Sequence, residues 1–176
     1  MALETENIQE KIAQKFGNEV LNFETHSGIF TFEVASESAH DAIQFLKEDT
    51  ELNFHFLTDL CAIHYPDNDV NHQYAVVYLL HNWVENFRIK VKTYLNGENP
   101  QVKTVCDLFL SANWMERETY DFYGIAFKGH PQLKRILNMD EMVSFPMRKE
   151  FPLEDSGRTD KDDRFFGRTK TNNQHV

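Results

Sequence analysis

The sequence predicts an α+β fold: a two-layer domain with a mixed sheet of about five strands and two or three helices, followed by an extended C-terminal strap. Several segments alternate apolar and polar residues, as half-buried strands do, and two others place apolar residues at helical spacing. Prolines at positions 146 and 152 exclude a long helix there, and residues 153–176 contain almost no aliphatic side chains.

The N-terminal segment predicts a helix followed by a hairpin. Apolar residues fall on one helical face at Ile8, Ile12, Ala13 and Phe16. Asn7 with Glu10 is expected to cap the start of this helix, and Gly17 to end it. Residues 20–24 and 29–34 then alternate around Ser27-Gly28, which indicates a hairpin. The side chains expected to point inward are Phe30, Phe32 and Val34.

A second helix and three strands complete the predicted sheet. Ser38 with Asp41 forms a capping pattern before apolar residues at helical spacing, namely Ala39, Ala42, Ile43 and Leu46. The strands are expected at residues 57–63, 74–80 and 87–95. YAVVYLL indicates a central strand buried on both faces, whereas FRIKVKTYL fits a sheet with one solvent-exposed side or a guarded edge.

We divide the chain into three parts. Residues 1–100 form the N-terminal α+β domain, 101–152 a helix plus a docking segment packed on it, and 153–176 an extended polar tail with five acidic and five basic residues. The helix of the second part is expected to start at Thr104 with Asp107 and to stop at Gly124.

The composition of the chain disfavours several classes of protein. The net charge is −10, and residues 1–60 alone hold 12 acidic and 3 basic residues, so nucleic-acid binding is disfavoured. No apolar run approaches the roughly 20 residues of a membrane span. The segment MALETENIQE resembles neither a secretory signal nor a transit peptide, so we expect cytoplasmic residence. Cys61 and Cys106 are expected to be reduced, buried thiols, and two cysteines cannot hold an ordinary iron-sulfur cluster alone.

Residues 113–123 predict a helix whose charges lie all around it. Glu118 shares a face with Trp114, whereas Glu116 faces Tyr120. Because its apolar residues argue against full exposure, each charge is expected to be packed against a partner. Arg117 and Asp121, four residues apart, are one candidate pair.

This helix and the segment after it resemble a known family. NWMERETYDFYGIAFKGHPQLKRIL and SFPMRKEFP are similar to two motifs of the family of NADH-quinone oxidoreductase C subunits. FLTDLCAIHYP, YAVVYLL and FRIKVKTYL upstream also resemble it, so the similarity spans residues 57–152. His64 and Phe145 stand where that family more often has Asp and Gly, and Tyr123 where it usually has Phe.

The resemblance implies a role in structure and docking for twelve residues. They are Glu116, Arg117, Glu118, Asp121, Gly124, His130, Pro131, Arg135, Pro146, Arg148, Lys149 and Pro152. It implies a non-catalytic subunit of the peripheral arm, inactive alone, on the cytoplasmic side of the inner membrane. Its implied partners are the hydrogenase-like quinone-site subunit (the D subunit), the terminal iron-sulfur subunit (the B subunit) and other peripheral-arm subunits. Iron-sulfur clusters, FMN and quinone would belong to those partners, with no cofactor in this chain.

Other interpretations stay open. One is the equivalent subunit of a membrane-bound hydrogenase or of a ferredoxin- or F420-fed oxidoreductase. Another is an independent enzyme using Glu116, Glu118 and Asp121, although Glu116 and Glu118 diverge on a helix. His130 is interpreted as a loop histidine beside Lys128 and Lys134 in preference to a metal ligand or proton carrier, since no second ligand lies at metal spacing. The basic cluster is interpreted as a docking surface and contains Lys128, Lys134, Arg135, Arg148 and Lys149.

Overall fold

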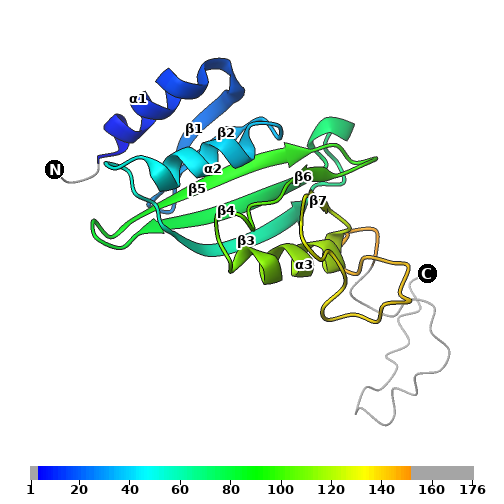
Figure 1. The fold of residues 1–176 in the computed structure, drawn as a ribbon. Coiled ribbons are helices and arrows are strands. Elements are labelled where there is room, and N and C mark those ends of the chain that lie inside the picture. The colour runs from blue at the N-terminus through cyan, green and yellow to red at the C-terminus, as the bar shows by residue number, and fades with distance from the viewer. Residues whose placement is uncertain (1–3, 152–176) are drawn as a thin grey trace, which may run out of the picture.

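A five-stranded sheet carries three helices on one face in the computed structural model, which describes residues 4–151 (Figure 1). The helices are α1 (Thr5–Phe16), α2 (Ala39–Glu48) and α3 (Ala112–Tyr123), with short 3-10 turns η1 (Gly17–Glu19) and η2 (Val70–His72). The strands are β1 (Val20–His26), β2 (Ile29–Val34), β3 (Phe56–His64), β4 (Tyr74–Asn82) and β5 (Phe87–Leu95). A two-stranded sheet of β6 (Gln101–Lys103) and β7 (Ala126–Lys128) lies beside them. The predicted α+β class is confirmed.

The main sheet is mixed. Its strand order is β1-β2-β5-β4-β3, in which β2 and β5 run parallel and the other neighbours run antiparallel. The β1–β2 hairpin turns at Ser27 and Gly28, both with positive φ, as the tight hairpin turn requires. The predicted hairpin is therefore confirmed, and so is the burial of the three side chains expected to point inward: Phe30, Phe32 and Val34.

The two faces of the sheet differ in chemistry. Paired residues alternate between faces, and the row Leu60–Tyr78–Val91–Phe32 is buried beneath the helices. The neighbouring row on the other face runs Cys61–Val77–Lys92–Glu33, where Lys92 and Glu33 form an ion pair at 3.2 Å. The open face confirms the solvent-exposed side predicted from FRIKVKTYL, but the guarded-edge alternative was wrong because β5 is the middle strand.

β4 is buried along most of its length, as predicted, although none of the helices within residues 4–151 covers its second face. Ala75 and Val77 point to the open side, where they are 0% and 9% exposed. Ala75 lies between its cross-strand partners Ile63 and Tyr94, which are larger. Flanking side chains therefore shield this strand from water in place of a second helical layer.

Several local predictions were wrong. α1 begins at Thr5, before the expected Asn7 cap, and the residue preceding it makes no side-chain capping bond. Ser38 does precede α2, yet its hydroxyl makes no capping bond either. The third helix begins at Ala112 and not at Thr104, because the Thr104 hydroxyl accepts the backbone N–H of Cys106 and starts a turn.

One hydrophobic cluster extends from α1 to β7 and includes residues on both sides of residue 100, such as Val91 and Val102. The proposed division into domains at that point stays a prediction. Cys61 and Cys106 are free thiols; Cys61 is exposed on the open face of edge strand β3, so the expectation that both are buried was wrong. Within residues 4–151 no helix is long and apolar enough to cross a membrane. Pro152 and the predicted tail 153–176 lie outside the described residues.

Replacement of Phe32 by Ala tests the position of the core. Its ring is 0% exposed, so we expect the free energy of unfolding to fall by about 3–5 kcal/mol in urea titration. Val84→Ala, at a side chain 79% exposed, is the matched control and should change that free energy by less than about 0.5 kcal/mol. Equal losses in the two variants would place the core elsewhere.

Candidate functional site: a charged helix and the strap folded on it

Helix α3 directs three of its charged side chains inward. Glu116, Arg117 and Asp121 are buried, whereas Glu118 is exposed beside Trp114. The helix ends as predicted at Gly124, whose φ of 74° is left-handed and whose N–H bonds to the Tyr120 carbonyl. The chain then runs through β7 into residues 131–151, here called the strap, which contains no helix or strand among its described residues.

Glu116 organises the turn before its own helix. Its carboxylate accepts the Thr104 hydroxyl and, at 2.7 Å, the backbone N–H of Val105. Burial raises the pKa of Glu116, and these two donors together with the Cys106 thiol partly oppose that rise. The carboxylate thus holds the segment that a helix was expected to occupy.

His130 lies close to this carboxylate. Cys106, Glu116 and His130 bring one ligand-type atom each within 4.8 Å of one another, a grouping that sequence spacing did not reveal. The His130 ring is nevertheless engaged on both nitrogens: Nε2 bonds to the Asn113 carbonyl at 3.1 Å, and Nδ1 accepts the Gln132 N–H at 3.0 Å. A metal ion would have to displace one of these bonds, so the ring is arranged as a loop anchor.

Arg117 does not pair with Asp121, and that prediction was wrong. Its Nε and Nη2 donate to the backbone carbonyls of Lys134 and Arg135, at 3.1 and 3.0 Å. Its guanidinium also lies 5.1 Å from the Trp114 ring centroid. Arg117 therefore binds the beginning of the strap to α3.

Asp121 binds the middle of the strap. Its Oδ2 accepts three consecutive backbone N–H groups, those of residues 136, 137 and 138, at 2.8–3.0 Å. Its Oδ1 pairs with Arg135 at 2.7 Å and accepts the Asn138 side chain. Burial tends to raise the pKa of Asp121, but the backbone donors and Arg135 outweigh it and hold that pKa well below its usual range.

Arg135 and Arg148 bind the remainder of the strap. Arg135, whose side chain is 7% exposed, also donates to the carbonyls of Asp121, Met142 and Ser144. Arg148 donates to the Tyr123 carbonyl at 2.8 Å and lies over the ring of Phe145. Two members of the predicted basic cluster are thus turned inward, while Lys128, Lys134 and Lys149 are exposed.

Gly124 leaves the space into which the strap packs. A Cβ built there would stand 2.6 Å from both the Arg148 Nη2 and a carbon of the Phe145 ring. Of the other signature positions, Pro131 is exposed and Pro146 half-buried within the strap. Sequence reasoning missed Asn138, Met142 and Ser144, two of which act through backbone carbonyls and so leave no residue-type signal.

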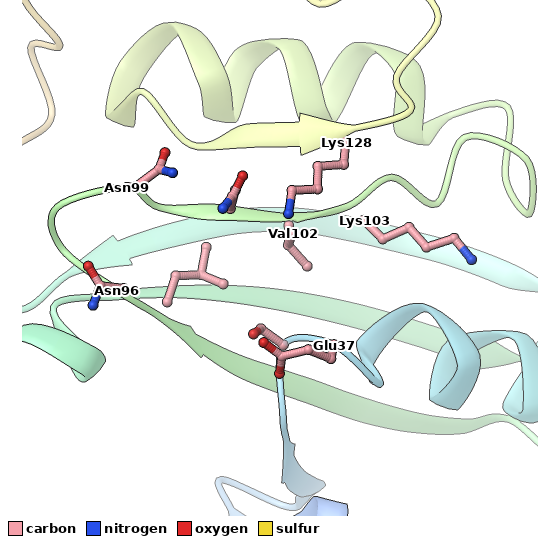
Figure 2. A pocket seen from close by; sticks show the side chains of 9 residues that line it. Glu37, Asn96, Asn99, Val102, Lys103 and Lys128 are labelled. Atoms are coloured by element: carbon pink, nitrogen blue, oxygen red, sulfur yellow. The ribbon is translucent and has the colours of Figure 1, made fainter.

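A separate polar pocket of about 230 Å³ lies beside the small sheet (Figure 2). Lys128 points across β6, with Glu37 and Asn96 on the opposite wall. None of the signature residues lines it. Because both basic and acidic side chains line the pocket, its charge does not favour either an anionic or a cationic ligand.

The comparisons with known proteins agree on one family. Residues 32–157 match the family model described as respiratory-chain NADH dehydrogenase, 30 Kd subunit. A C subunit of NADH-quinone oxidoreductase from Rhizobium meliloti is 41% identical over 143 residues, covering 81% of this chain and 76% of the relative. The C subunit from Geotalea uraniireducens is 36% identical over 84% of this chain and 88% of that protein.

Two solved structures share the fold. The trypsin-resistant fragment of Nqo5 has a TM-score of 0.61 at 31% identity, covering 73% of this chain and 98% of the fragment. A chain of the membrane-bound sulfane sulfur reductase, an archaeal respiratory membrane complex, has a TM-score of 0.70 at 25% identity, with 84% and 85% covered. Fold, charged helix and matched family together define a respiratory-chain subunit of the 30 Kd class. The chain belongs to the family of NADH-quinone oxidoreductase C subunits.

A pair of glycine variants tests the packing at the end of α3. Gly124 and Gly28 have nearly equal positive φ, 74° and 76°, but nothing lies within 4 Å of a Cβ at Gly28. Gly124→Ala should therefore lower the free energy of unfolding by about 1–3 kcal/mol more than Gly28→Ala, measured in urea. Equal losses would show that backbone strain alone matters and that the strap does not pack there.

Asp121→Asn tests the strap anchor. A carboxyl whose pKa is lowered by folding contributes stability that is present above its unfolded value of about 3.9 and is lost as pH falls below it. The native chain should therefore lose more stability between pH 6 and pH 3 than Asp121→Asn does, in urea titrations at each pH. Asp140→Asn, at an exposed carboxylate of the same strap, should retain the native pH dependence. Identical profiles for all three proteins would contradict this role.

Proposed function

We propose that this chain is a non-catalytic structural subunit of the peripheral arm of NADH-quinone oxidoreductase. In this role it holds the hydrogenase-like quinone-site subunit and the terminal iron-sulfur subunit together, on the cytoplasmic side of the membrane. Electron transfer from NADH to quinone then takes place in those neighbours. Family membership supports the general assignment, and the site supports the structural role.

The observation that carries the proposal is the use of buried charge to fix an irregular, apolar surface. Arg117, Asp121 and Arg135 direct their hydrogen bonds to strap backbone, which a loop without helix or strand needs to be stable. The strap so held displays large apolar side chains to solvent, namely Leu137 at 65%, Met139 at 72%, Val143 at 93%, Met147 at 50% and Phe151 at 41% exposure. A rigid apolar surface of this kind is typical of a permanent protein interface.

The same contacts disfavour an independent carboxylate-dependent enzyme. Glu116 is 0% exposed and bonded to its own turn, Glu118 is on the outside of the helix, and Asp121 is saturated by donors from the strap. The three carboxylates do not converge on a shared space. Glu116 and Asp121 instead stabilise the fold through their hydrogen bonds.

A second candidate is the equivalent subunit of a related respiratory complex with another electron donor. The similarity in fold to a chain of the archaeal sulfane sulfur reductase complex, with a TM-score of 0.70 over 84% of this chain, favours it, whereas the higher sequence identity of the Nqo5 fragment, 31% against 25%, favours the first candidate. Both candidates share the structural role and differ in the identity of the neighbours.

Charge placed on the apolar surface should prevent assembly. Leu137→Asp with Val143→Asp should leave the fold intact by circular dichroism, yet reduce assembled complex in native gels at least about tenfold, since two charges would be buried without partners. The control is Val84→Asp, because Val84 is a similarly exposed apolar residue that lies away from the strap. It follows the end of β4, whereas Tyr74, which Arg148 of the strap contacts, is at the start of that strand. The control variant should assemble normally.

The identity of the neighbours is tested by purification from gently solubilised membranes. An N-terminal tag suits this purpose, because helix α1, the first described element, lies at the opposite end of the molecule from the strap (Figure 1). Mass spectrometry should find the quinone-site and iron-sulfur subunits with the native chain and not with the double Asp variant. Normal assembly of that variant with lost turnover would contradict a purely structural role.

A further inference from the structure

His64, the last residue of β3, bonds to the far end of the strap. Its Nδ1 accepts the backbone N–H of Lys149 at 3.0 Å, across 85 positions of sequence. The side chain is nearly buried, with the residue 8% exposed. Only an unprotonated ring nitrogen accepts a hydrogen bond, so this contact requires the neutral imidazole with its proton on Nε2.

The same nitrogen has a second partner within reach. The Glu150 Oε2 lies 3.6 Å from Nδ1, too far for a good hydrogen bond with the ring as it stands. Once Nδ1 carries a proton it becomes a donor, and it then faces the Lys149 N–H donor on one side and the Glu150 carboxylate on the other. The two contacts exclude each other, because one needs the lone pair and the other the proton.

The surroundings of the ring favour its neutral form. His64 stacks on Tyr74 of β4 with ring centroids 4.5 Å apart, and the Arg148 guanidinium already lies 5.3 Å from that Tyr74 ring. Burial lowers the pKa of His64, Glu150 opposes this, and Arg148 and Lys149 add to it. The neutral contact therefore contributes stability that is present above the unfolded value of about 6.5 and is lost as pH falls through the lowered pKa.

We propose that His64 is a proton-operated latch: when neutral it holds the Lys149 backbone N–H against the sheet, and when Nδ1 is protonated it releases that N–H and pairs with the Glu150 carboxylate instead. Loss of this bond frees the Lys149 backbone N–H and weakens the packing of the neighbouring Arg148 side chain against Gly124. The latch concerns the chain's own folding and holds whether or not the strap binds a partner.

Amide hydrogen exchange of the full-length chain tests the latch. Between pH 7.5 and pH 5.0 the protection factor of the Lys149 amide, corrected for intrinsic exchange rates, should fall at least about fivefold. The amides of Val76 and Tyr78, buried in β4, report the global fold and should not change by that factor. The fall in Lys149 protection should coincide with the titration of the His64 ring in NMR spectra, which is expected below the ordinary histidine value because burial lowers the pKa of His64.

Two substitutions separate the latch from a general acid effect. His64→Asn places an amide oxygen where Nδ1 stands, so its Lys149 amide should stay protected at both pH values. His64→Ala removes the acceptor, and its Lys149 amide should exchange fast at both. A pH-independent Lys149 amide in the native chain, or an equal fall in His64→Asn, would overturn the proposal.

Discussion

The structure of the strap, residues 131–151, depends on one interaction, the buried Asp121 carboxylate that accepts three consecutive backbone N–H groups and a guanidinium. A loop without helix or strand has no ladder to satisfy its backbone, so its polar groups need side-chain partners or water. Asp121 supplies the acceptor for the donors, and Arg117 and Arg135 supply donors for the carbonyls. Together they replace a secondary structure with a set of charge-assisted bonds, which are stronger than neutral ones.

This arrangement explains how a helix with charges on every side can be a packed element. Its inward charges meet mainly backbone groups, with one opposite charge at the Asp121–Arg135 pair, so the cost of burying them is offset within the chain. The outward face retains Trp114 and Glu118 for solvent or for a neighbour. Helix α3 therefore connects the hydrophobic core to the strap, whose exposed apolar side chains do not form a second core.

The periodicity of the sequence is sufficient to predict the strands of the sheet, but it does not predict the hydrogen-bond partners in the site. Strands such as β5 carry a strict alternation, and their positions follow from it because one face is buried. Spacing on an isolated helix predicts the pair Arg117–Asp121, but both groups find partners in a segment 14 to 18 residues further on. No local pattern encodes which carbonyl a guanidinium will reach. For the same reason Thr104 fits the pattern of a helix cap, although in the structure it serves Glu116 in a turn.

The parallel pairing of β2 with β5 has a consequence for the order of folding. Phe32 and Val91 are partners in the register, and a helix and two further strands lie between them in the chain. The middle of the sheet thus closes a long loop, which is entropically costly and slow compared with a hairpin. During synthesis the β2 edge of the β1–β2 hairpin has no strand partner until β5 has left the ribosome. Helix α3 follows all five strands of the main sheet in the chain and packs against β3, so it can dock only once that strand is in place.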